Sequence, residues 1–210
     1  LDDDAAGTGA DGKTAGSGAA GSENTTGKAD GQNGAAGSAA SGHANKKHSG
    51  LMKDKITINA SRTEYGDGRA EIFDLGLFDQ RGNLTNLLLK GEMFTIKERI
   101  RFHAPLKCPI FTYTIKDKKG TDLSGTNTMY EGADVKPVNE GDVYDVSFTQ
   151  KMTLQGGEYL LSMSCTGFEG EEHVVYHRLY DVANITVISN KNTVGVYDME
   201  SEVETKLTRG

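Results

Sequence analysis

The sequence predicts an all-β fold, an antiparallel sandwich of about seven to nine short strands. Three observations predict it. Beyond residue 50, apolar residues recur at every second position in short runs. Clusters of Gly, Asn and Asp separate these runs, as expected for turns between strands. Hardly any segment repeats its apolar residues with the 3.6-residue period of a helix, so the period of two assigns the fold class.

The first half of the folded region contains four expected elements. The run at 70–79 is apolar on both faces, which is typical of a strand buried inside a sheet or at an interface. The run at 92–103 is apolar on one face, except that Glu98 interrupts that face. In order, the elements are a strand at 56–58, a turn at 64–68, and strands at 70–79 and 92–103.

The second half continues the same pattern. Strands are expected at 109–116, 142–152, 159–165, 174–180, 185–188 and 194–197, with a hairpin turn at 117–120. Helical turns are expected only at 85–89 and in the charged tail after Asp198. The segment 83–89 is compatible with either a helix or a loop.

Composition divides the chain into three parts. Gly and Ala account for nearly half of residues 1–50, where Leu1 is the only large apolar side chain. Such a segment cannot bury enough apolar surface to offset an ordering cost of roughly 1–2 kcal/mol per residue. We therefore expect a disordered, Gly/Ala-rich linker at 1–52, a β-sandwich at 53–200 and a flexible tail at 201–210.

Charge and cysteine content exclude several classes of protein. The 23 basic and 30 acidic residues give a net charge of −7, so the basic surface that nucleic-acid binding requires is not expected. No apolar run reaches the ~20 residues of a membrane-spanning helix, and the first 30 residues lack the apolar core of a signal peptide. Cys108 and Cys165 are expected to be reduced core residues.

The motifs that suggest chemistry lack the required context. Residues 7–14 match the phosphate-loop pattern, but no strand precedes them and no helix follows. His173 and His177 have a spacing that suits zinc only on a helix, and they fall in a predicted strand. No nucleophile elbow or paired catalytic carboxylates can be identified. We therefore predict no catalytic residue, metal or cofactor.

The remaining candidates are aromatic and polar side chains on a sheet face. Sugars present C–H faces that stack on aromatic rings, and hydroxyl groups that pair with charged or amide side chains. The predicted carbohydrate-binding residues are Glu98, Arg99, Tyr113, Tyr176, His177, Arg178 and Tyr180.

An ordered set of phrases adds a family resemblance. The phrases are Gly91-Glu92, Pro109-Ile110-Phe111, Lys119-Gly120, the segment 124–128 and the segment 154–161. In this order they resemble the C-terminal carbohydrate-binding domain of Wzt-type ATPase subunits, which belong to ABC transporters that export O-antigen and related polysaccharides. The resemblance covers roughly residues 55–200, but the long Gly/Ala tract and Glu98 on an apolar face depart from the pattern.

The resemblance implies an immunoglobulin-like sandwich, dimeric, with terminal strands exchanged between protomers. It also implies a non-catalytic domain that recognises the terminal sugars of a lipid-linked polysaccharide at the cytoplasmic face of the plasma membrane. Its partners would be that glycan, an ATPase domain and the transmembrane permease.

Two other functions remain open from the residues alone. The leading alternative is a secreted adhesive or surface-layer module with the same sandwich, in which the Gly/Ala tract is an extracellular spacer. A β-sandwich glycosidase or lyase comes third, because it requires two carboxylates or a metal cluster converging in a cleft.

Overall fold

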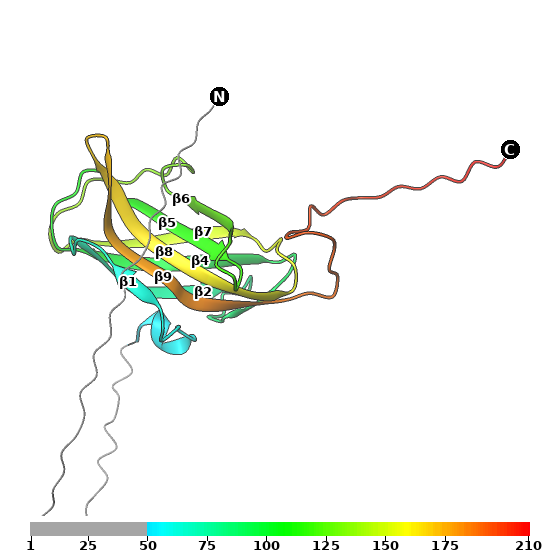
Figure 1. Ribbon diagram of the computed structural model, residues 1–210, viewed down its shortest axis with the longest axis horizontal. Helices are drawn as coiled ribbons and strands as arrows, with labels where there is room; N and C mark the ends of the chain where they lie inside the picture. Colours follow the sequence, from blue (N-terminus) through cyan, green and yellow to red (C-terminus); the bar gives the residue numbers. More distant parts are fainter. Residues whose placement is uncertain (1–49) are drawn as a thin grey trace, which may run out of the picture. The chain divides into compact units, whose positions relative to one another are not determined.

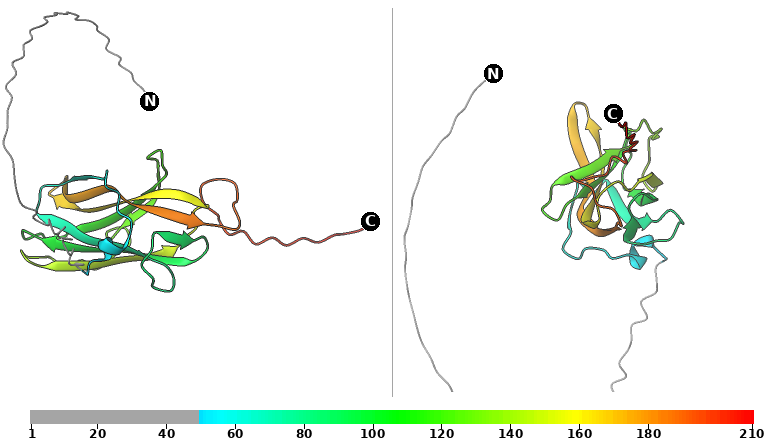
Figure 2. Two further views of the ribbon diagram at one scale, coloured as in Figure 1. Left: turned by 90° about the horizontal axis from the view of Figure 1, so that it is seen from below. Right: turned by 90° about the vertical axis from the view of Figure 1, so that its right-hand side faces the viewer.

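The computed structural model describes residues 50–210, which form two β-sheets packed face to face (Figures 1 and 2). Residues 1–49, which include most of the predicted linker and the phosphate-loop match at 7–14, lie outside the described residues. The elements are the 3₁₀ turn η1 (Met52–Lys55) and the strands β1 (Thr63–Tyr65), β2 (Ala70–Phe78), β3 (Leu87–Leu89), β4 (Met93–Phe102), β5 (Ile110–Lys116), β6 (Asp122–Asn127), β7 (Val143–Lys151), β8 (Gly157–Glu169) and β9 (Glu172–Ile188).

The two sheets differ in width. The larger has six strands in the order β1-β9-β8-β5-β6, with β3 also pairing with β9. The smaller has three strands in the order β2-β4-β7. All pairs are antiparallel except β3 with β9, which is parallel. The predicted immunoglobulin-like sandwich is therefore confirmed, with nine strands in the described part of the chain.

The core lies between the sheets and follows from the alternation of side chains. Along β4, the inward residues Phe94, Ile96, Ile100 and Phe102 are at most 3% exposed. They meet an equally apolar face of the larger sheet, which includes Phe111 at 0% exposed. Burial of these two faces is the main favourable contribution to folding.

Several element predictions need correction. Residues 87–89 form strand β3 rather than a helix or loop, because parallel pairing with β9 satisfies their backbone groups. Residues 64–65 lie in β1 rather than in the expected turn. The expected strands at 56–58 and 194–197 are reduced to single bridges, Ile58 to Ala183 and Leu154 to Tyr197. Residues 174–188 belong to one continuous strand.

The two cysteines and the tail also differ from expectation in part. Cys165 is a buried free thiol as predicted, but Cys108 is exposed in the β4–β5 connection. Residues 198–210 contain no helical turn.

Asp74 fixes the start of the folded region. Its buried carboxylate accepts hydrogen bonds from the backbone N–H groups of Met52 at 3.2 Å and Lys53 at 3.0 Å, and from Leu75 at 3.0 Å. Met52 thereby lies against Gly76 of β2, where a Cβ atom would clash with the Leu84 side chain at 2.7 Å. Residues 51 and 52, assigned to the linker from composition, are thus part of the sandwich.

An ion pair holds the segment that follows β9. The Lys90 ammonium lies 3.0 Å from Asp198, and both side chains are 8% exposed. A backbone hydrogen bond from Glu200 and the contact with Lys90 lower the pKa of Asp198 to about 2. Lys90 also donates to Gln155 at 2.8 Å, which links the segment to the β7–β8 connection.

Glu98 occupies the central inward position of β4. It is 0% exposed, and neither carboxylate oxygen accepts a hydrogen bond from any described residue. Burial raises the pKa of Glu98 well above its ordinary value. A buried, unpartnered carboxyl group costs free energy even when it is protonated.

Replacing Glu98 with Met is expected to raise the free energy of unfolding by about 1–3 kcal/mol at pH 7, because it removes this uncompensated group at similar volume. Because the pKa of Glu98 is raised in the folded state, ionisation of Glu98 destabilises the folded protein. The native protein therefore loses stability as pH rises above the unfolded-state pKa of about 4.3, and it does not have this loss below that pH. The difference between variant and native protein in urea unfolding should therefore shrink from pH 7 to pH 4.5. Equal or lower stability of the variant at pH 7 would contradict this account.

Replacing Asp74 with Ala is expected to lower the free energy of unfolding by about 1–3 kcal/mol, because three backbone N–H groups lose their acceptor. Hydrogen exchange at Met52 and Lys53 should accelerate more than exchange within β4. Asp79→Ala is the control, because Asp79 makes a similar set of bonds, but only within its own exposed loop.

Candidate functional site

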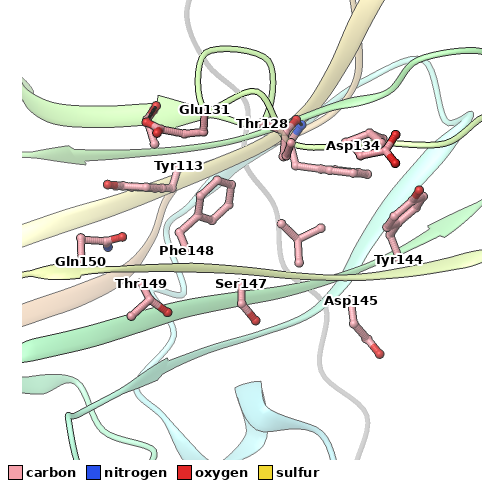
Figure 3. A pocket seen from close by; sticks show the side chains of 15 residues that line it. Tyr113, Thr128, Glu131, Asp134, Tyr144, Asp145, Ser147, Phe148, Thr149 and Gln150 are labelled. Atoms are coloured by element: carbon pink, nitrogen blue, oxygen red, sulfur yellow. Dashed lines mark hydrogen bonds between the residues drawn. The ribbon is translucent and has the colours of Figure 1, made fainter.

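A cleft of about 460 Å³ opens between the edge strands of the two sheets, β6 on the larger and β7 on the smaller (Figure 3). Its volume is within the ~300–1,000 Å³ range of small-molecule sites. One wall is β7, the other is β5 with β6, and the connection at 128–135 closes one side. The lining residues are Phe111, Tyr113, Thr126, Thr128, Glu131, Ala133, Asp134, Val135 and residues 144–150.

The period of two places the aromatic side chains in this cleft. On β7, Tyr144 and Phe148 occupy inward positions, and on β5, Phe111 and Tyr113 are buried. The ring centroids of Tyr113 and Phe148 are 5.0 Å apart in an edge-on arrangement, and those of Phe111 and Tyr144 are 5.2 Å apart. These two pairs bridge the sheets and form an aromatic floor.

Two hydrogen bonds hold the wall at 128–135 in place. Thr128 Oγ1 accepts from the Phe111 N–H at 3.1 Å, which joins the start of the connection to β5. The Tyr144 hydroxyl accepts from the Lys136 N–H at 2.8 Å, which joins its end to β7. The cleft is therefore bounded by fixed backbone on both sides.

Gln150 is the polar residue of most interest in the cleft. It occupies an inward position of β7, next after Phe148, and Figure 3 shows its amide beside Tyr113 and Phe148. Its Nε2 atom is buried and finds no acceptor among the described residues. Burial of an unpaired N–H donor costs free energy, so such a group favours a ligand that offers an oxygen atom.

The Tyr113 hydroxyl and Glu131 add a donor and an acceptor. Burial and, to a smaller extent, the charge of Glu131 raise the pKa of Tyr113, so its hydroxyl stays protonated at neutral pH. Glu131 accepts a hydrogen bond from Thr126 Oγ1 at 2.6 Å and keeps further acceptor capacity.

The other carboxylates of the cleft are exposed and engaged. Asp134 pairs with Lys136 at 2.6 Å, and Asp145 pairs with Arg99 at 2.7 Å. The part of the chain that the structure describes contains no group of three His, Cys, Asp or Glu residues that could hold a metal ion. The side chains of the cleft can hydrogen-bond to a polar ring and stack against it, so the arrangement suits the binding of a ligand.

The structure separates the predicted binding residues. Tyr113 alone lines the cleft. Glu98 is enclosed in the core, out of reach of any ligand on the surface. Arg99, its neighbour, points to the outer face of the smaller sheet, where its guanidinium lies 5.1 Å from the Phe73 ring.

His177 and Tyr176 serve the packing of the sheets. The Ile72 N–H donates to His177 Nδ1 at 2.9 Å, which links β2 to β9 across the sandwich. Because Nδ1 accepts, the proton of the neutral ring lies on Nε2, 3.0 Å from Glu64. The register shifts between Cys165 and Thr166, a β-bulge that interrupts the alternation and buries Tyr176 as well as His177.

Arg178 and Tyr180 do come together, on the outer face of the larger sheet. Arg178 Nη1 donates to the Tyr180 hydroxyl at 3.4 Å and to the Tyr65 hydroxyl at 3.2 Å. These residues are separate from the cleft, since two strands, β8 and β5, lie between β9 and β6.

Sequence reasoning missed Tyr144, Phe148, Gln150 and Glu131 as site residues. The alternation predicts the strand at 142–152, but it does not distinguish a core position from a position in a cleft. A signal was present, because Gln150 places an amide in the inward phase of an otherwise apolar row. The edge position of this strand is a property of topology and cannot be read from the strand itself.

No helix among residues 50–210 is long and apolar enough to span a membrane.

Comparison with solved structures identifies a match in fold. A crystal structure of the C-terminal domain of Wzt superposes with a TM-score of 0.68 at 22% identity, covering 73% of this chain and 93% of that chain. A CARDB domain from Pyrococcus furiosus, crystallised with metal ions, has a TM-score of 0.33 at 12% identity and covers 56% of this chain and 94% of that chain. A TM-score this low supports no argument. Among curated proteins, no sequence matches.

The family model named Wzt C-terminal domain matches residues 61–199, which include β1 to β9 and every residue that lines the cleft. The match confirms the predicted resemblance over about two thirds of the chain. The chain belongs to the Wzt C-terminal domain family.

Proposed function

We propose that this protein is the non-catalytic carbohydrate-binding domain of an ABC transporter that exports a lipid-linked polysaccharide, and that the cleft between β6 and β7 binds the glycan. Family membership supports the first part. The second part rests on the buried amide N–H of Gln150, which has no partner among the described residues and lies beside aromatic rings in this cleft.

The chemistry of the cleft matches that of a neutral sugar. Rings of Tyr144 and Phe148 offer apolar surface to C–H groups. Gln150 Nε2 and the Tyr113 hydroxyl donate hydrogen bonds, and Glu131 accepts them from sugar hydroxyl groups. The carboxylate of Glu131, which has no cationic partner among the described residues, disfavours an anionic group in the cleft.

In the full transporter, the domain would recognise the terminal sugars of the glycan at the cytoplasmic face of the plasma membrane. Its partners would be the ATPase domain, to which residues 1–50 would connect it, and the membrane permease. A homodimer, with strands exchanged between protomers, would place two clefts in one assembly, so that weak binding at each site would add to avidity.

Replacing Gln150 with Met is expected to weaken binding of oligosaccharides prepared from the host's export polysaccharide about five- to tenfold, because a donor to the sugar is lost, on the order of 1 kcal/mol. The same change should leave the free energy of unfolding equal or higher, since the amide N–H has no protein partner to lose. Isothermal titration and urea unfolding measure the two quantities.

Gln80→Met is the matched control, because Gln80 lies in the exposed β2–β3 connection, outside the cleft. Its affinity should equal that of the native domain. Unchanged affinity in Gln150→Met would place the glycan elsewhere, and no binding by the native domain at millimolar glycan would contradict the proposed function itself.

A further inference from the structure

A second hollow, of about 240 Å³, lies on the outer face of the larger sheet. Four hydroxyl side chains form its floor on two neighbouring strands, with Thr112 opposite Ser164 and Thr114 opposite Ser162. The two serines are 4% and 5% exposed, although they lie on the face that points away from the core. Side chains of the flanking strands must therefore rise above them as walls.

An irregularity in β9 shapes one wall. The register between β8 and β9 shifts between Leu161 and Met163, and Asp181 adopts a positive φ of 52°. Ser162 Oγ takes the place of a backbone acceptor at this irregularity, because it accepts a hydrogen bond from the Asp181 N–H at 2.9 Å. A bulge of this kind redirects the side chains beside it, and here Tyr180 and Arg178 form the wall.

Arg178 has no carboxylate within ion-pair distance among residues 50–210. By contrast, Arg62, Arg69, Arg99 and Arg101 all pair with carboxylates. Its Nη1 group donates to two tyrosine hydroxyls, and the guanidinium lies 5.7 Å from the Tyr180 ring. Of the five N–H donors of a guanidinium, those on Nε and Nη2 have no acceptor among residues 50–210 and stay available to a ligand.

Lys116 and Asp122 complete the lining of the hollow. Lys116 lies 4.4 Å above the Tyr180 ring, with Asp122 and Asp181 each 3.9 Å from its ammonium group. The two carboxylates balance this cation, and Asp122 lines the hollow as an acceptor. Lys116 thus lies between the wall formed by Tyr180 and the acceptor Asp122, whereas Arg178 has no carboxylate partner of its own among residues 50–210.

We propose that this hollow binds a saccharide that carries an oxyanion, either a carboxylate or a phosphate group. The oxyanion pairs with Arg178, which is suited to planar, charge-assisted hydrogen bonds. The hydroxyl groups of the sugar reach the Ser and Thr floor and Asp122. This inference rests on the proposed function that the domain binds saccharides, and it adds a second site with a preference for charge that the acidic cleft lacks.

The test compares four probes on the full chain: glucuronic acid, glucose 6-phosphate, glucose and inorganic phosphate. Titration followed by amide NMR should show the two acidic sugars binding at least about tenfold more tightly than glucose, with shifts at Ser162, Ser164 and Arg178. Arg178→Gln should reduce their affinity about tenfold. Arg81→Gln, which removes an arginine from an exposed loop, should leave it unchanged.

Equal affinity for glucose and glucuronic acid, or an Arg178→Gln variant that binds normally, would overturn the proposal. So would tight binding of inorganic phosphate or of phosphatidylglycerol vesicles that depends on Arg178 while the acidic sugars fail to bind, because the site would then recognise the anion without the sugar. Binding of neutral export oligosaccharide that depends on Gln150 is measured in parallel. If that binding persists, the proposed function stands even when the acidic sugars fail.

Discussion

The unequal width of the two sheets is the constraint on which the structure depends. Three strands face six, so the smaller sheet cannot cover the whole inner surface of the larger one. The inner surface near β5 and β6 is therefore partly open, and edge strand β7 lies opposite it. A sandwich with equal layers would bury Tyr113 and Phe148 entirely in the core, whereas here they line a cleft. The cleft is thus a direct result of the topology.

The same constraint explains why the polar residues have different roles. Glu98 sits at the middle of β4, where the overlap of the sheets is complete, and so it is enclosed without a partner. Gln150 sits on β7, where the overlap ends, and its amide reaches the cleft. Both residues interrupt an apolar inward row. Their distance from the open edge decides that Glu98 lies in the core and that Gln150 lines the cleft.

Much of the fold could be predicted from sequence, because the period of two is local. The strands at 70–79, 92–103, 109–116 and 142–152 follow from alternation alone. Strand β3 could not be predicted in this way, since its parallel pairing with β9 depends on residues about 100 positions away. The bulge at Tyr176 likewise hid the inward direction of His177, because strict alternation no longer applied.

The candidate site was less accessible to sequence reasoning than the fold. Chemical type selected Tyr113, Arg178 and Tyr180, and all three line hollows. It could not show that they lie at two places on opposite sides of the larger sheet. Arg99 and His177 were selected for the same chemistry and prove to be engaged by Asp145 and by Ile72. The partners of a polar side chain decide whether it is available, and those partners come from tertiary structure.

The most direct test of the account is an amide NMR titration of the domain with a neutral oligosaccharide from the host's export polysaccharide. The account predicts saturable shifts at residues 144–150 and 128–135, on both walls of the cleft, and none on the outer face of the smaller sheet. Shifts confined to the outer face of either sheet, with none at Gln150, would contradict it.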